Sequence, residues 1–208
     1  MIYRKDIALK VANYLLEIKA IKLNPQDLFT WASGIKSPIY CDNRISLAYP
    51  EARSFIKESF AALLKEEFKE VNLIAGVATA GIAHGALLAD FLELPFCYVR
   101  SKAKAHGTKS LIEGKLSKGD KVLVVEDLFS TGGSAVKAIH ALKEEGADIQ
   151  GAVAIFNYGF SKVDQAFQEV QTPFYTLSNF ESLLSLLEED SQYQREDLEA
   201  MKSWYLSM

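Results

Sequence analysis

Cysteine is scarce in this chain, which has only Cys41 and Cys97 among its 208 residues. Two thiols cannot build the disulfide framework of a small secreted domain, and their spacing fits no zinc-binding pattern. We interpret both as small, partly buried hydrophobic residues in a reducing environment. The N-terminal segment MIYRKDIALK places charged residues before any apolar run, so it does not read as a signal peptide. These absences predict a cytoplasmic protein.

An excess of one charge is also missing. The chain has 23 Lys and Arg against 27 Asp and Glu, a net charge of −4. No basic field is available for general nucleic-acid binding, so we expect no nucleic-acid partner, and any anion site must be local. The sequence has no repeat and no Gly/Ser/Pro-rich linker. At roughly 100–200 residues per domain, residues 1–208 are predicted to form a single domain.

One uncharged stretch, 73–89 (LIAGVATAGIAHGALLA), resembles a membrane span. It is shorter than the roughly 20 residues that a spanning helix needs, and it contains three glycines and His84. We interpret it as a buried strand, a glycine turn and a packed helix, with His84 as a structural residue. No membrane association is expected.

Hydrophobic periodicity predicts an α/β fold. Apolar strands alternate with helices, a pattern typical of a mostly parallel central sheet flanked by helices on both faces. Ligands of such sheets bind at the carboxyl ends of the strands. Helices are predicted at 3–20, 50–69, 81–92, 132–145 and near 161–169. Strands are predicted at 28–31, 38–43, 72–76, 96–99, 121–126, 149–156 and 173–176, with a polar stretch at 100–120 and an acidic tail, 188–199, as a solvated helix without a function.

The segment KVLVVEDLFSTGGSA, 121–135, carries the strongest chemical signal. Glu126 and Asp127 follow a Val/Leu strand, and adjacent buried carboxylates are costly unless they bind something, such as diol hydroxyls or a nearby metal. Ser130–Ser134 then lead into a helix, where glycines let backbone N–H groups approach a phosphate. The alternative is that STGGS is only a helix cap. Neither G-x-x-x-x-G-K-[ST] nor G-x-G-x-x-G occurs.

A local basic run, RSKAKAHGTK at 100–109, follows the strand predicted at 96–99. Its position after a strand of the same sheet places it at the ligand edge. A cationic loop there can close over a leaving group and neutralise its developing charge. The alternative is an ordinary solvated surface loop.

These motifs resemble those of known enzymes. Residues 122–134 resemble the 5-phosphoribosyl 1-diphosphate (PRPP) signature of type I phosphoribosyltransferases. The resemblance implies that fold, with Glu126 and Asp127 on the ribose hydroxyls and the loop around the 5-phosphate. The PRPP-binding residues implied in this segment are Glu126, Asp127, Leu128, Phe129, Ser130, Thr131, Gly132, Gly133 and Ser134.

Residues 98–114 (YVRSKAKAHGTKSLIEG) resemble the catalytic loop of the orotate phosphoribosyltransferases within that family. The resemblance implies that Arg100, Lys104 and His106 contact the diphosphate of PRPP and reach into the site of the partner subunit of a homodimer. Many members have Lys directly after the Arg, whereas this chain has Ser101; Lys102 is a possible substitute.

Two further blocks agree with that family. Residues 29–44 (FTWASGIKSPIYCDNR) are similar to its N-terminal S-G-x-K-S-P segment, which implies a small N-terminal hood formed mainly by about 1–45. The PRPP-contacting Lys of some members is replaced by Ala32. For orotate, the implied contacts are Ser130, Lys36, Tyr40 and Arg44, although Lys36 and Arg44 can also be read as solvated charges. In GVATAGI, 76–82, the backbone of Thr79 and Ala80 falls where the family binds diphosphate.

The resemblance implies transfer of phosphoribosyl from PRPP to orotate, which gives orotidine 5-phosphate and diphosphate on the route to UMP. Lys104, His106 and Asp127 are the implied catalytic residues. Mg²⁺ is the expected cofactor, carried by PRPP without direct protein ligands. One rival is a phosphoribosyltransferase for a purine base. Another is a non-catalytic regulator of the same fold that binds nucleotide or RNA.

Overall fold

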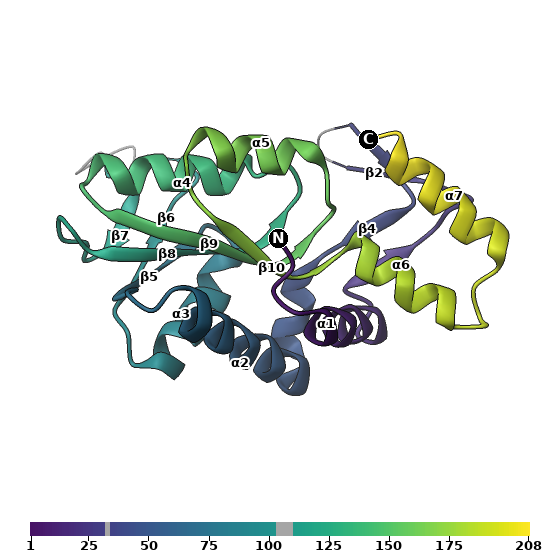
Figure 1. Cartoon of the computed structure of the whole chain (residues 1–208), viewed down its shortest axis with the longest axis horizontal. Helices are drawn as coiled ribbons and strands as arrows, with labels where there is room; N and C mark the ends of the chain where they lie inside the picture. Colours follow the sequence, from purple (N-terminus) through teal and green to yellow (C-terminus); the bar gives the residue numbers. More distant parts are fainter. Residues whose placement is uncertain (32–33, 103–109) are drawn as a thin grey trace.

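The computed structural model describes residues 1–31, 34–102 and 110–208. Its centre is a six-stranded sheet in the order β10-β9-β8-β5-β6-β7, in which only β7 runs antiparallel to its neighbour (Figure 1). The predicted mostly parallel sheet is confirmed. The strands are β5 (Leu73–Val77), β6 (Phe96–Val99), β7 (Ile112–Gly114), β8 (Lys121–Phe129), β9 (Asp148–Asn157) and β10 (Phe174–Asn179).

Helices cover both faces of this sheet. α1, α2 and α3 lie on one face, and α4 and α5 lie on the other (Figure 1). β8 alternates between the two hydrophobic cores: Leu123 belongs to the first, while Val122 and Val124 belong to the second. The helices are α1 (Lys5–Glu17), α2 (Pro50–Glu67), α3 (Ala80–Leu92), α4 (Gly133–Glu144), α5 (Ser161–Glu169), α6 (Phe180–Glu189) and α7 (Arg195–Leu206).

Glycines let the start of α3 approach the sheet closely. A Cβ on Gly81 would lie 2.3 Å from the carbonyl oxygen of Val125 in β8, and a Cβ on Gly76 would lie 2.9 Å from the carbonyl oxygen of Gly81. Only glycine permits backbones to come this near. The turn between β5 and α3, which contains Thr79, is thereby held beside the carboxyl end of β8.

Two small antiparallel pairs lie beyond the sheet. β1 (Ile21–Leu23) pairs with β4 (Ile39–Cys41), and β2 (Phe29–Thr30) pairs with β3 (Lys36–Ser37). A 3₁₀ segment, η1 (Asn43–Ala48), follows β4 and leads toward α2. These elements fall in the predicted hood, whose boundary stays a prediction.

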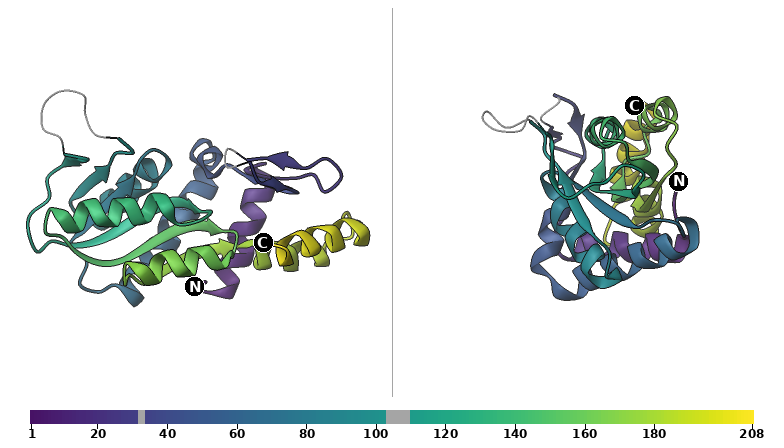
Figure 2. Two further views of the ribbon diagram at one scale, coloured as in Figure 1. Left: turned by 90° about the horizontal axis from the view of Figure 1, so that it is seen from above. Right: turned by 90° about the vertical axis from the view of Figure 1, so that its left-hand side faces the viewer.

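The prediction of a single solvated helix over the acidic tail is wrong. α6 ends at Glu189 and α7 begins at Arg195, and together they lie at the opposite end of the molecule from β7 (Figures 1 and 2). Trp204 of α7 donates its indole N–H to the carbonyl oxygen of Lys36, at 2.8 Å, and its ring lies near Trp31. One side of α7 thus packs against the β2–β3 region, so the tail is not solvated all round.

Strand ends differ from the prediction where polar residues continue a strand. β8 extends to Phe129 rather than residue 126, because its pairing with β9 continues to Phe129 and Asn157. The short strands β1 and β7 were not predicted, since each has only 3 residues and a segment that short gives no clear periodic pattern. Within the described residues, no helix combines the length and apolar character that crossing a bilayer requires.

Candidate active site

Two adjacent carboxyl groups lie near the carboxyl end of β8. Glu126 is only 6% exposed, and the backbone N–H of Asp127 donates to its Oε1 at 3.0 Å. Burial raises the pKa of both carboxyl groups, and the charge of Asp127 raises the pKa of Glu126 further. The two groups titrate together, and the pair resists carrying two negative charges.

A cleft of about 350 Å³ opens over this pair. It lies between the carboxyl ends of β5 and β8, the edge at which the α/β pattern predicts a ligand. Three separate segments of the chain meet there: the end of β4 with the start of η1, the β5–α3 turn, and β8 with the start of α4. The lining residues are Cys41, Asp42, Arg44, Ala78, Thr79, Ala80, Glu126, Asp127, Leu128 and Ser134.

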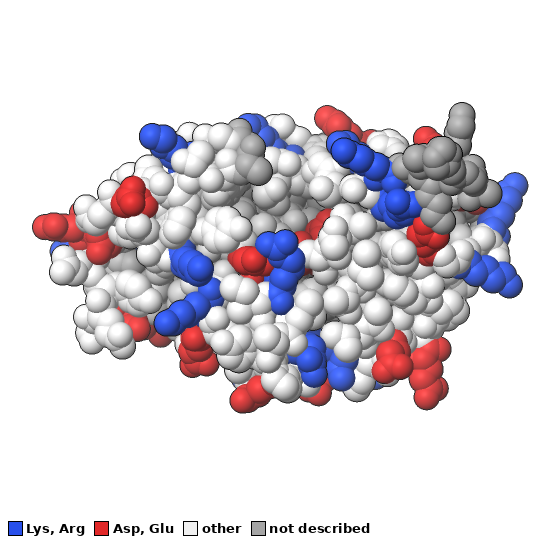
Figure 3. Space-filling view, turned by 180° about the vertical axis from the view of Figure 1, so that it is seen from behind, with Lys and Arg blue, Asp and Glu red and all other residues white. Residues whose placement is uncertain are grey.

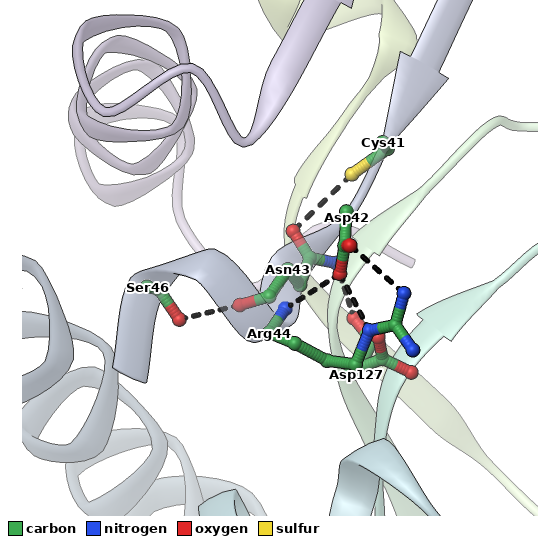
Figure 4. A network of polar contacts seen from close by, with 6 residues as sticks. All are labelled: Cys41, Asp42, Asn43, Arg44, Ser46 and Asp127. Carbon is green, nitrogen blue, oxygen red and sulfur yellow. Dashed lines mark hydrogen bonds and ion pairs between the residues drawn. The ribbon is translucent and has the colours of Figure 1, made fainter. Parts of the chain in front are cut away.

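Arg44 forms a two-pronged ion pair with Asp42 at the rim of the cleft. Its Nε lies 2.6 Å from Oδ1 and its Nη2 lies 2.8 Å from Oδ2 (Figure 4). The guanidinium lowers the pKa of Asp42, and the carboxylate raises that of Arg44. The arginine side chain is 60% exposed, so it is accessible to a ligand in the cleft.

Asn43 is a buried polar residue that sequence reasoning missed. Its Nδ2 donates to the carbonyl oxygen of Asp127 at 2.7 Å, although the two residues are 84 positions apart (Figure 4). No local motif marks it, because its partner is a backbone group on a distant strand. The only signal was its place at the end of the strand predicted at 38–43, in the block that matched the family.

The phosphate-loop glycines have distinct roles. Gly132 is the residue before α4 and has φ +78°, a conformation that favours glycine, and its absent Cβ would face Ala166 and Phe167 of α5. A Cβ on Gly133 would meet only the Thr131 hydroxyl, at 3.8 Å. No side chain caps α4, so its first N–H groups are available to an anion, and the simple Ser/Thr-cap alternative is not supported.

This difference predicts separable effects. Gly133→Val should weaken PRPP binding about tenfold at nearly unchanged melting temperature, because the new side chain crowds the anion-facing side of the loop. Gly132→Ala should instead lower stability by about 1 kcal/mol through backbone strain. Calorimetric PRPP titration and thermal unfolding measure the two effects. Wild-type PRPP affinity in folded Gly133→Val would show that the loop does not hold the phosphate.

Several predicted residues lie outside this cleft. The Arg100 guanidinium lies 3.3 Å from the Glu113 carboxylate and lines a neighbouring cavity of about 330 Å³. The side chain of Phe129 is in the core against Phe167, so only its backbone can meet a substrate. Lys36, Tyr40, Ser130 and Thr131 do not line the cleft. Lys104 and His106 lie outside the described residues.

Metal ligands are not clustered in the part of the chain that the structure describes. No group of three or more His, Cys, Asp or Glu side chains there could hold an ion. Among the described residues, the carboxyl groups that line the cleft are those of Asp42, Glu126 and Asp127.

Comparison with known proteins identifies a family and curated relatives for this chain. The family model described as "Phosphoribosyl transferase domain" matches residues 49–175, more than half of the chain. The orotate phosphoribosyltransferase of Staphylococcus haemolyticus is 50% identical over 198 residues, which cover 95% of this chain and 98% of that protein.

Solved structures agree with this assignment. The orotate phosphoribosyltransferase of Aeropyrum pernix has a TM-score of 0.77 at 27% identity, covering 87% of this chain and 99% of its own. The fold also matches that of the Mycobacterium tuberculosis orotate phosphoribosyltransferase in complex with PRPP, with a TM-score of 0.66 at 19% identity, covering 85% and 98%. With the acid pair, the open helix start and half of the residues shared with a curated member, the chain belongs to the orotate phosphoribosyltransferases of the phosphoribosyl transferase domain family.

Proposed function

We propose that this protein transfers the phosphoribosyl group of PRPP to orotate, forming orotidine 5-phosphate and diphosphate in the synthesis of UMP. The observation that carries the proposal is the buried Glu126–Asp127 pair in a cleft bounded by the β5–α3 turn and the start of α4. Its supporting context is 50% identity to a curated orotate phosphoribosyltransferase over nearly the whole chain.

PRPP fits the three sides of the cleft. Its ribose hydroxyls can donate hydrogen bonds to the carboxyl oxygens of Glu126 and Asp127, and such bonds are strong when the accepting carboxylate is ionised. Its 5-phosphate can bind the free N–H groups of 131–134 at the start of α4, where the helix dipole favours an anion. Its diphosphate can bind backbone N–H groups of Thr79 and Ala80, a role that does not depend on their side chains.

The reaction needs the two substrates to be held in position, and it needs no covalent intermediate with the protein. A ring nitrogen of orotate attacks the anomeric carbon while the bond to diphosphate breaks, through a transition state with oxocarbenium character, by analogy with other glycosyl transfers. The protein holds both reactants in line and stabilises charge on the leaving diphosphate. Asp127, on the ribose hydroxyls, fixes the sugar during this step. We assign the diphosphate charge to Arg100, Lys104 and His106, and His106 can also donate a proton.

Mg²⁺ is part of the proposal as a companion of PRPP. The described residues place two adjacent carboxyl groups in the cleft, and in the proposal substrate oxygens and water hold most of the coordination positions of the ion. When bound, Mg²⁺ neutralises diphosphate charge. Glu126 and Asp127 are the groups that would face it from the protein.

Orotate binding is assigned to the rim of the cleft. Orotate carries a carboxylate, and among the described residues that line the cleft Arg44 is the cationic one; Lys36, Tyr40 and Ser130 are further proposed contacts. Arg44 presents a planar guanidinium that can turn from Asp42 to a second carboxylate.

Arg44→Ala should therefore raise the KM for orotate about tenfold and leave the KM for PRPP nearly unchanged. The matched comparison uses uracil, which has the same ring without the carboxylate. The rate with uracil should be the same in the variant as in the wild type, because uracil has no carboxylate for Arg44 to bind. An equal loss with both bases would show that Arg44 supports the fold of the cleft instead of reading the carboxylate.

The proposal includes a homodimer in which residues 100–109 of each chain serve the partner's site. An extended chain spans up to about 3.3 Å per residue, so a loop of this length can cross a two-fold interface. Binding of nucleic acid is not proposed, and on the face shown in Figure 3 positive and negative side chains are interspersed.

The function is tested by mixing the protein with PRPP, Mg²⁺ and one base at a time. Loss of orotate absorbance, with orotidine 5-phosphate and diphosphate as products, is expected. Parallel reactions with hypoxanthine, adenine and uracil separate the rivals. Turnover of a purine base in place of orotate would favour the purine enzyme, and no turnover of any base by folded protein that binds PRPP would favour a regulator.

A further inference from the structure

Asn43 connects the hood side of the molecule to the acid pair. Its side chain is fully buried at the start of η1. The amide uses both of its ends: Nδ2 donates to the Asp127 carbonyl at 2.7 Å, and Oδ1 lies 3.2 Å from the Cys41 thiol, which donates to it (Figure 4). A buried amide with two partners has one preferred orientation, so it fixes the groups that it joins.

The contact from Asn43 reaches β8 where the strand has lost one of its two neighbours. β5 pairs with β8 only as far as Val125, whereas β9 continues to Phe129. Beyond Val125, β8 thus has a strand on one side only, and this is the part that carries Glu126 and Asp127. Asn43 supplies a hydrogen bond to the backbone there, where an unpaired buried carbonyl would otherwise be costly.

We propose that Asn43 is a positioning residue that holds the backbone of Asp127, and through it both carboxylates, in the orientation that binds the ribose hydroxyls of PRPP. The inference rests on the proposed function, in which Glu126 and Asp127 bind the ribose. Asn43 itself is not among the residues that line the cleft. It links the segment that carries Arg44, which is proposed to bind orotate, to β8, whose carboxyl groups are proposed to bind the ribose.

The residue type agrees with this role. The groups that face this region are Cys41 of β4, Asp42 and Arg44 beside Asn43, Glu126 and Asp127 of β8, and Tyr158 after β9. Three of them are carboxyl groups and one is a guanidinium that Asp42 already pairs. A neutral amide can donate to a carbonyl here without adding a further negative charge.

The first test compares Asn43→Ala with Ser46→Ala. Ser46 is also fully buried, and its hydroxyl donates to the Asn43 carbonyl oxygen at 2.6 Å, but it does not touch β8 through that bond. Asn43→Ala should raise the PRPP dissociation constant about tenfold, the scale of one lost hydrogen bond, with the KM for orotate within about twofold of wild type. Ser46→Ala should change neither. Equal PRPP affinity in Asn43→Ala and wild type would overturn the proposal.

Asn43→Asp gives a readout that a merely structural residue would not produce. It keeps the shape but replaces the donor by an oxygen, which repels the Asp127 carbonyl when ionised and donates to it when protonated. Burial at this position, close to Asp42 and Asp127, should raise the pKa of the introduced carboxyl far above the usual value of about 3.9. The PRPP dissociation constant of Asn43→Asp, relative to wild type, should therefore fall several-fold from about pH 8.5 to about pH 5.5. The same ratio should stay constant for Asn43→Ala. A constant ratio for both variants would contradict the proposal even if Asn43→Ala folds poorly.

Asp127→Asn distinguishes failure of the ribose assignment from failure of the positioning role of Asn43. If this variant binds PRPP normally, the ribose assignment fails and the role of Asn43 falls with it. If Asp127→Asn loses affinity while both Asn43 variants match wild type, only the positioning role is rejected.

Discussion

Asp127→Asn is expected to lose most of its transferase activity while it remains folded. A charged hydrogen bond to the ribose hydroxyls is worth about 1.5–3 kcal/mol, or roughly 10- to 150-fold in PRPP affinity or rate. Steady-state kinetics and calorimetric titration with PRPP measure the loss. The matched control is Asp148→Asn, which should behave as wild type. Asp148 is exposed at the start of β9, at the edge of the sheet away from the cleft. Unchanged PRPP affinity and rate in Asp127→Asn would reject the ribose assignment.

The stability of the same variant should depend less on pH than that of the wild type. The pKa of each carboxyl group of the pair is raised by burial, so the folded state holds more protons than the unfolded state above about pH 4. Wild-type stability should consequently fall as the pH rises through this window. Asp127→Asn removes one of the two charges, and its melting temperature should fall less between pH 5 and pH 8. A steeper fall in the variant would contradict the description of the pair.

Mixing two inactive variants is expected to restore activity. In the proposed dimer, Lys104 acts in the partner's site and Asp127 acts in its own chain's site. A mixed dimer of Lys104→Ala and Asp127→Asn subunits thus has one doubly altered site and one site with both native groups. Random equal mixing makes half of the dimers mixed, so about a quarter of all sites should work, by two-fold symmetry.

The activity of the mixture is compared with that of each variant alone, after subunit exchange has been verified with differently labelled chains. If the loop serves its own chain, every site carries one lesion, and mixing restores nothing. Verified exchange without regained activity would reject loop sharing and leave the orotate assignment in place.

The sequence predicted the parts of the fold that depend on local pattern. The Val/Leu run of β8 and the Pro50–Glu51 start of α2 are local signals, and both elements formed where they were predicted, although β8 extends to Phe129 and α2 ends at Glu67. The meeting of the Cys41–Arg44 segment with β8 was expected only from resemblance, and the Asn43–Asp127 bond was missed because it joins a side chain to a backbone atom across the fold. The role of α7 was missed for a similar reason, since Trp204 finds its partner on β3.

Residue types in the phosphate loop predicted the kind of site but not the role of each glycine. STGGS predicted an anion site, but sequence could not distinguish Gly132, which needs a positive φ, from Gly133, which leaves space open. Backbone conformation and the direction of an absent Cβ appear only in three dimensions. They change which glycine is the informative one to substitute.

We expect the Glu126–Asp127 pair and the start of α4 to bind PRPP together, and a crystal structure of the protein with PRPP and Mg²⁺ is the decisive experiment. The two ribose hydroxyls should lie within hydrogen-bond distance of the carboxylates of Glu126 and Asp127, with the 5-phosphate on the N–H groups of 131–134. A ribose bound away from both carboxylates, or a 5-phosphate bound elsewhere than the start of α4, would contradict it.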